Sequence, residues 1–527
     1  MKKILNDKLI NILVKIMSIV LFGIVFISLI FVDTNIKYTY SNDIKLRNYI
    51  YLGIIAIIIL IAGIFKLLFK KQKIKDTKVF KFISKNLNII IGIMFVLLFL
   101  AQVVIEKNIY FETSWDAEHI INTAINFAKN GVFENNNYYD VYPYFSVYPN
   151  NLFLAAIFSV IGKVVANFNI EKLYEVLILI DIILVDLSGI IMLKTIKNIT
   201  KSKLVKLVSA ILFITLIGFS PWFMVPYSDT YAILFPITVL YNYTVKEKKW
   251  YNYLMIGLFS YAGYLIKPTA IIVLIAIAII EIYKALFKIK DMNKNKVKEY
   301  SKNLLCLILG IVIVFGINVG LKKAINYKVE KDYSFSLWHY FMMGLSQDTT
   351  GCFNSGDVTN SLGMDTYEYR VENNKKVFKE RVKELSESKK MGSFYLKKLL
   401  VNYNDGTFAW GREGWFYKTL KENDSKLSKA LKSFYYNEGS HFDMFTSIMQ
   451  TIWLGMIIFI TITAIFGNFE NKKSVIFLSI IGLTLFTLIF EGRARYLYLY
   501  SPFYIILAAM GVEVLNKVKI GKFKHWN

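Results

Sequence analysis

The chain has 527 residues, 55% of them hydrophobic, and a formal net charge of +25. An ordinary soluble domain is about 45–50% apolar, so this composition argues against a soluble protein, and only two cysteines argue against a disulfide or zinc framework. The lysines flank apolar runs, which is typical of topology control in membranes and argues against a nucleic-acid partner.

The apolar residues form repeated runs near the length that crosses a membrane. A helix needs roughly 20 apolar residues to cross the hydrocarbon layer, and backbone in lipid must satisfy its own hydrogen bonds. We therefore predict an all-α polytopic membrane protein with about 12 transmembrane helices. In chain order they lie at 9–31, 50–69, 86–105, 173–193, 204–221, 230–245, 251–266, 269–286, 303–321, 447–467, 474–490 and 496–514. The first run is too long for the core of a signal peptide, so we expect it to be retained as a span.

The lysine distribution predicts which ends of the spans face the cytoplasm. Lysines collect at 70–85, 194–206, 246–249, 288–302, 471–473 and after 517. The positive-inside rule makes these segments cytoplasmic, which predicts a multi-pass cell-membrane protein of the bacterial type with both termini inside. The apolar run 150–165 would place 194–206 outside if it crossed the membrane. We therefore interpret that run as a helix at the outer interface.

This topology divides the chain into four parts. Residues 1–85 hold two transmembrane helices and a basic cytoplasmic loop, and residues 86–321 form a transmembrane module with a first outer loop at 106–172. Residues 322–446 form a second outer segment, long enough for a small domain. Residues 447–527 hold the last transmembrane helices and a basic tail.

A polar cluster opens the first outer loop, in the sequence FETSWDAEHI. Asp116 follows the end of a span closely, and Asp116 and His119 are spaced i, i+3, so one helix face presents both. A carboxylate at this depth can act as a general base toward an acceptor hydroxyl. The alternative is a helix cap, supplied by Ser114 or Asp116. Glu118 belongs to the same cluster and is a candidate substrate contact.

Two further acids lie at predicted outer ends. Asp140 and Tyr142 belong to the tyrosine-rich stretch YYDVYPYFSVYPNN, which fits either an interfacial aromatic belt or a wall that contacts a sugar. Asp229, in VPYSDTYAILF, follows the span at 204–221, where it serves either as a helix cap or as a functional group. Asp116 and Asp229 come from different loops but are predicted at the same outer interface.

Cationic side chains share that interface. Lys267 lies between two spans in YLIKPTA, and Arg493 and Arg495 precede the last span in FEGRARYLYLYSP. Arginine binds phosphate through a planar fork and lysine binds it as a point charge. The alternative is that all three are anchors at the membrane surface.

The roles of the acids Asp181 and Asp186 and of one outer aromatic stretch stay open. Asp181 and Asp186 fall inside an apolar span, where acids are either functional, often as proton relays, or neutral and bonded to a polar neighbour. The outer stretch NYNDGTFAWGREGWF contains Arg412 and Glu413 beside Asp405 and tryptophans. Such a cluster suits carbohydrate contact, but a packed loop core has the same composition.

These motifs resemble the GT-C superfamily of integral-membrane glycosyltransferases, in particular the protein O-mannosyltransferases and aminoarabinose transferases. Asp116 of SWDAEH matches the family's catalytic Asp early in the first outer loop, and VYPNNLFLAAIFSVIGK matches its interfacial helices. Asp229 of PYSD matches a later outer acid, and Arg495-Tyr496 matches an Arg-Tyr pair that precedes a proline, here Pro502. The resemblance covers roughly residues 86–515. The chain departs from the family in having Asp-Ala-Glu for the acid pair and two extra spans before the usual first one.

The resemblance implies a polyprenyl-phosphate sugar donor and a hydroxyl acceptor outside the cytoplasm, on a glycan, a lipid or a protein. We expect Asp116 and Asp229 to be catalytic and Lys267, Arg493 and Arg495 to bind the donor phosphate. Candidate substrate contacts are Glu118, Asp140, Tyr142, Arg412 and Glu413.

No cofactor is required by this pattern. A divalent metal ion at Asp229 is an open alternative, although no set of ligands with clear spacing supports it. Membrane lipid is the remaining expected partner. The alternative functions are a lipid-linked glycan flippase or secondary transporter that uses Asp181 and Asp186, although the internal repeats common in transporters are not seen, and a polysaccharide polymerase.

Overall fold

The computed structural model describes residues 2–31, 48–68, 78–133, 137–138, 142–288, 294–410 and 417–517. Most of these residues are helical. The helices of the first part are α1 (Lys2–Phe31), α2 (Asn48–Leu68), α3 (Lys78–Ile109), α4 (Trp115–Asn130), α5 (Tyr144–Val147), α6 (Leu152–Ala166), α7 (Leu173–Ile199), α8 (Lys203–Phe213), α9 (Ser228–Tyr231), α10 (Leu234–Thr244), α11 (Trp250–Ile266) and α12 (Ile272–Lys288). Those of the second are α13 (Lys294–Ile325), α14 (Leu337–Met343), α15 (Ser355–Leu362), α16 (Tyr367–Glu387), α17 (Met391–Tyr403), α18 (Lys426–Tyr435), α19 (Phe442–Phe466), α20 (Asn471–Ile489) and α21 (Ser501–Lys517).

Within the described ranges, nine helical segments are long and apolar enough to cross a membrane. They are Lys8–Phe31, Lys81–Ile109, Pro149–Ala166, Ile170–Ile199, Pro268–Leu286, Asn295–Ile325, Phe442–Phe466, Asn471–Ile489 and Ala494–Lys517. The prediction of a multi-pass helical membrane protein is therefore confirmed. Pro149–Ala166 includes the run that the sequence places at the interface. Its α-helical part, α6, has 15 residues, or roughly 22 Å, against a hydrocarbon layer of roughly 30 Å.

The predicted spans at 204–221 and 230–245 are shorter as helices than the sequence suggests, whereas the predicted span 251–266 is a continuous helix, α11. Helix α8 has 11 residues and runs into a five-residue π-helical turn, η4 (Ile214–Gly218), and α10 has 11 residues. Pro221 then begins the 3-10 helix η5 (Pro221–Met224). Because hydropathy does not register these interruptions, the sequence predicts continuous helices where the structure has breaks. The breaks place the segment 219–233 among the helices.

Small residues set the crossing of α11 and α13. A Cβ atom added at Gly257 would lie 1.9 Å from the carbonyl oxygen of Leu307, and one added at Gly310 would lie 2.2 Å from that of Leu254. Only glycine allows the two backbones to approach so closely, as in other membrane helix pairs. Helix α11 ends at Ile266, and Pro268 begins the 3-10 helix η6 (Pro268–Ile271). Lys267 lies at this break, between the end of α11 and the start of η6.

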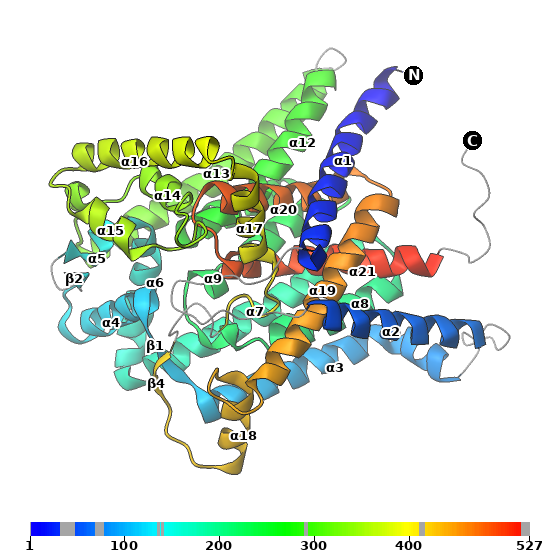
Figure 1. Cartoon of the computed structure of the whole chain (residues 1–527), viewed down its shortest axis with the longest axis horizontal. Coiled ribbons are helices and arrows are strands. Elements are labelled where there is room, and N and C mark those ends of the chain that lie inside the picture. Colours follow the sequence, from blue (N-terminus) through cyan, green and yellow to red (C-terminus); the bar gives the residue numbers. More distant parts are fainter. Residues whose placement is uncertain are drawn as a thin grey trace.

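The two long segments that leave α3 and α13 pack against each other on one side of the molecule, which we call the loop side. Strand β1 (Phe111–Thr113) pairs antiparallel with β4 (Tyr417–Leu420), and β2 (Asn137–Tyr138) pairs with β3 (Tyr142–Pro143). The backbone N–H of Glu330 donates to Ser146 Oγ at 2.9 Å, and Ser334 Oγ donates to the Ser146 carbonyl at 2.8 Å. Figure 1 shows α4, α5, α14, α15 and α16 gathered on the left, away from both chain ends.

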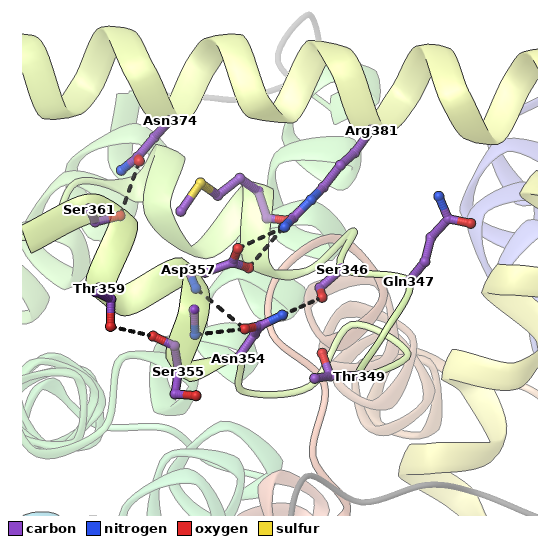
Figure 2. Close-up of polar contacts among 12 residues, drawn as sticks. Ser346, Gln347, Thr349, Asn354, Ser355, Asp357, Thr359, Ser361, Asn374 and Arg381 are labelled. Atoms are coloured by element: carbon purple, nitrogen blue, oxygen red, sulfur yellow. Dashed lines mark hydrogen bonds and ion pairs between the residues drawn. The ribbon is translucent and has the colours of Figure 1, made fainter. Parts of the chain in front are cut away.

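A partly buried polar network, in which Arg381 of α16 also donates to the Met342 carbonyl of α14 at 2.7 Å, holds α14, α15 and α16 together (Figure 2). Arg381 donates to both carboxylate oxygens of Asp357, at 2.7 and 2.8 Å. Asn354 caps α15 by accepting from the backbone of Gly356 and Asp357, and it donates to Ser346 Oγ at 2.8 Å. Paired, directional bonds of this kind give the second loop segment a fixed conformation. It can therefore support the first loop segment, against which it packs.

Candidate functional site

Asp116 lies at the start of α4, where the chain turns out of β1. Trp115 has a left-handed backbone with φ 60°, a conformation that costs a bulky residue roughly 1–3 kcal/mol. Ser114 occupies the N-cap position but its side chain does not cap the helix. The Asp116 carboxylate instead accepts from two tyrosines: Tyr144 OH at 2.6 Å on Oδ1 and Tyr227 OH at 3.0 Å on Oδ2. These contacts, and not a helix cap, account for its orientation.

Tyr144 and Tyr227 both act as hydrogen-bond donors to Asp116. Burial, followed by the adjacent Asp116 carboxylate, raises the pKa of Tyr144 and of Tyr227 well above the usual value, so both hydroxyls stay protonated. Asn151 Nδ2 donates to Tyr144 OH at 2.6 Å, which leaves the tyrosine proton directed at Asp116. The ring of His119 stacks on Tyr144 with 4.5 Å between centroids, and burial lowers the pKa of His119. His119 therefore packs against the Tyr144 ring as a neutral imidazole.

Asp229 is fully buried at the start of α9 and is surrounded by cations. Its Oδ1 lies 2.6 Å from Lys267 Nζ, and its Oδ2 lies 3.6 Å from Arg495 Nη1. Three separated stretches of chain thus meet at one carboxylate. The Asp229 carboxylate therefore relieves the repulsion between Lys267 and Arg495.

Tyr227 joins the two acids into one cluster. Its hydroxyl contacts Asp116, while its ring centroid lies 5.6 Å from the guanidinium carbon of Arg495. Tyr496 completes the contact, with its ring 4.4 Å from Lys267 Nζ. We define the Asp116–Asp229 cluster as Asp116, Tyr144, Tyr227, Asp229, Lys267, Arg495 and Tyr496. A small cavity lined by residues 113–117 with Val225, Tyr227 and Arg495 opens onto its Asp116 end.

The structure therefore brings together four residues that the sequence singled out: Asp116, Asp229, Lys267 and Arg495. Arg493 is not among them, because it pairs with Glu491 and lies 5.4 Å from the Phe353 ring. A 3-10 turn, η9 (Ala494–Tyr500), begins after Arg493, so the two arginines take different directions.

The expected substrate contacts are placed less favourably. Glu118 pairs with Lys418 of β4. Tyr142 packs edge-on against Tyr333, at 5.8 Å between centroids, in a separate apolar cluster. Asp140, Arg412 and Glu413 lie outside the described residues.

Asp405 has a local role. Its Oδ1 accepts from the backbone N–H and the hydroxyl of Thr407 at 2.8 and 2.6 Å, and its Oδ2 accepts from the N–H of Ala409 at 2.9 Å. The tight turn that results places Trp410 in the core, where its Nε1 donates to the Tyr435 carbonyl. A packed loop core thus describes the structured part of this motif better than a carbohydrate contact.

The acids of the apolar span do not touch the cluster. Asp181 is completely buried on α7, and Asp186 is 7% exposed and hydrogen-bonds to Gln102 of α3. Among the residues that the structure describes, no group of three or more His, Cys, Asp or Glu side chains is placed to hold a metal ion. At Asp229 the partners are cationic, which opposes binding of a divalent ion there.

Comparison with protein families gives the chain a wider context. The family model described as "conserved hypothetical integral membrane protein" matches residues 9–515. The chain belongs to this family of integral membrane proteins. No curated protein and no solved structure matches it.

For this integral membrane protein, sequence reasoning missed Tyr144 and Tyr227, and it noted Tyr496 only as part of the Arg-Tyr motif. Tyr144, Tyr227 and Tyr496 each contact a charged member of the cluster. A signal was present, since Tyr227 lies two residues before Asp229 and Tyr496 directly follows Arg495. With 35 tyrosines in the chain, however, an interfacial belt is the more frequent explanation.

Proposed function

We propose that the chain is a membrane glycosyltransferase of the GT-C type, which moves a sugar from a polyprenyl-phosphate donor to an extracytoplasmic hydroxyl. One observation on the structure supports this proposal. A partly exposed carboxylate, Asp116, and a cation pair, Lys267 and Arg495, lie in one cluster at the loop side. Transfer from a lipid phosphate requires a base near the acceptor and positive charge near the leaving group.

Asp116 is suited to the role of base by its position. It lines the cavity, and its two tyrosine bonds fix the plane of the carboxylate. A carboxylate oxygen has more than one lone-pair direction, so an acceptor hydroxyl can approach while both tyrosines remain bonded. Tyr144 and Tyr227 are positioning residues in this scheme, because they act through Asp116 and not on the sugar.

Positive charge is arranged in two layers. Arg495 lines the cavity and offers a planar fork to phosphate oxygens. Lys267 lies behind it, bonded to the buried Asp229. In this proposal Asp229 holds the two cations together. This role replaces the expected ones, a direct catalytic role or binding of a metal ion, because its oxygens already face Lys267 and Arg495.

The chemical step is a single displacement with inversion. The acceptor oxygen loses its proton to Asp116 and forms a bond to the anomeric carbon, while the bond from that carbon to the phosphate oxygen breaks. The electron pair leaves with polyprenyl phosphate, whose added negative charge is stabilised by Arg495 and Lys267. The cavity is small compared with the several hundred cubic ångströms of ordinary ligand pockets. Binding of the sugar therefore requires lining side chains other than Asp116 and Tyr227, such as Trp115 or Arg495, to move.

Arg495 and Arg493 provide a matched pair for testing the proposal. The purified full-length protein in nanodiscs is titrated with a radiolabelled polyprenyl-phosphate hexose, and release of polyprenyl phosphate is followed in the presence of membrane extract as the acceptor source. We expect Arg495→Gln to weaken donor binding at least roughly tenfold, as for loss of a charge-assisted contact. Arg493→Gln, which removes the same charge from a residue paired with Glu491, should stay within about twofold. Equal behaviour of the two variants would contradict the assignment.

A further inference from the structure

A groove separate from the Asp116–Asp229 cluster lies along the transmembrane helices. It has a volume of about 600 Å³ and runs between α3 and α7. Most of its lining is apolar, with Phe95 and Phe99 on α3 facing Ile183, Leu187 and Ile190 on α7. It shares no residue with the Asp116–Asp229 cluster or with the cavity beside it.

Three lysines line one end of this groove: Lys194 and Lys197 of α7 and Lys206 of α8. Lys194 and Lys197 are exposed and one helical turn apart. Lys197 is near enough to Lys206 for their like charges to repel. Lys206 Nζ donates to Asn88 Oδ1 of α3 at 2.5 Å. Within the described part of the chain, no carboxylate forms an ion pair with any of the three, so an external anion would relieve their repulsion.

The direction of α7 shows where this end lies. Helix α7 begins at Leu173, directly after the first loop segment, so its C-terminal end with the lysines lies away from the loop side. From Lys197 to Ile183 the groove extends 14 residues along α7, roughly 21 Å. One leaflet with its headgroup layer is roughly 20–22 Å thick. The groove thus has the length of one lipid and charge at the end where the phosphate would lie.

We propose that this groove binds an anionic phospholipid, with its phosphate at Lys194, Lys197 and Lys206 and one acyl chain along the apolar wall. The inference is independent of the proposed glycosyltransferase activity. Asp186 also lines the groove, but it is only 7% exposed, so the acyl chain passes a largely buried side chain. Basic pockets between membrane helices commonly hold such headgroups.

Gly92 offers a way to fill the groove without disturbing the fold. It lines the groove on α3, and a Cβ atom added there would meet no other atom within 4 Å. A leucine at this position would occupy the volume of the acyl chain. Gly316 of α13 is equally open but does not line the groove, so Gly316→Leu is a matched control for the same change in a membrane helix.

Charge is tested with a second matched pair. Replacing all three groove lysines with Gln removes three charges, and so does replacing Lys296, Lys298 and Lys302, which are exposed near the start of α13. Helix α13 starts after α12, which itself starts near the cluster at η6, so these control lysines lie at the same end of the bundle as the groove lysines.

The measurement is native mass spectrometry of the purified full-length protein, titrated with phosphatidylglycerol or with phosphatidylcholine of the same chains. We expect phosphatidylglycerol to bind more tightly. Loss of the groove lysines should weaken it by roughly fivefold per lysine, or about a hundredfold in total. Gly92→Leu should abolish the tight site without lowering the unfolding temperature in detergent, and both controls should bind as the unaltered protein does.

Three results would overturn the proposal. One is a groove-lysine variant that binds phosphatidylglycerol as tightly as its α13 control. Another is retention of the tight site by folded Gly92→Leu protein, which would place the lipid on the lysines but outside the groove. The third is tighter binding of polyprenyl phosphate than of phosphatidylglycerol at this site, which would assign the groove to a different lipid.

Discussion

Replacement of Asp116 by Asn is the most informative single change in this protein. Asn has nearly the same size and keeps one oxygen that can accept a hydrogen bond from a tyrosine hydroxyl, but it cannot take up the proton of an acceptor hydroxyl. A positioned base contributes about 10²–10⁴-fold to a rate, which is about 3–5 kcal/mol of barrier. We therefore expect sugar transfer to fall at least roughly a hundredfold, while donor binding stays nearly unchanged because Arg495 and Lys267 are retained.

Glu118→Gln is the matched control. It removes the same charge from the same helix two residues later, at a carboxylate that pairs with Lys418, and it should leave transfer within about twofold of normal. The assay is single-turnover transfer from a synthetic polyprenyl-phosphate sugar, with expression and unfolding temperature measured in parallel. If Asp116→Asn kept more than a tenth of normal transfer, Asp116 would not be the base. If instead Asp181→Asn abolished the activity and Asp116→Asn did not, a carrier would be the better description.

Other predictions concern the supports of the site and the loop side. Tyr227→Phe should reduce turnover roughly tenfold with little change in donor affinity, since it removes one bond to the base; a change confined to donor affinity would contradict this. Lys267→Met should lower the free energy of unfolding by at most roughly 3–5 kcal/mol, because the buried Asp229 carboxylate loses its 2.6 Å partner and keeps only Arg495 at 3.6 Å, and adding Asp229→Asn should restore most of that loss but not donor binding. Burial, with the charge of Arg370, lowers the pKa of His339 to about 3, so stability should fall as pH decreases from about 6.5 toward 3 because the unfolded chain binds the proton first. Amide exchange in α14 at pH 4.5 and 7 should show this acid loss in the unaltered protein and in a His441→Gln control, but not in His339→Gln.

Much of the site's location could be predicted from the sequence, for a physical reason. Charged side chains near span ends are confined to a thin layer at the membrane surface, so Asp116, Asp229, Lys267 and Arg495 had few places to lie relative to one another. The sequence could not choose between Arg493 and Arg495, because that choice depends on the 3-10 turn that begins at Ala494.

Local geometry limited the remaining predictions in the same way. Tyr142 and Tyr144 are two residues apart, yet the end of β3 and the start of α5 send the first to Tyr333 and the second to Asp116. The sequence also could not predict the short helices α8 and α10 between residues 203 and 244. Hydropathy averages over a window and does not register the π-helical turn at Ile214–Gly218 or the break at Pro221.

The pairing of β1 with β4 has a consequence for the time at which the site forms. Phe111 pairs with Leu420, about 300 residues later in the chain. At a synthesis rate of about 5–20 residues per second, the partner strand emerges roughly 15–60 s after β1. Arg495 follows later still. During that interval the ribosome carries a nascent chain whose Asp116 has left the membrane but has neither its strand partner nor its cations, so truncated products of translation would carry the acid without the rest of the cluster.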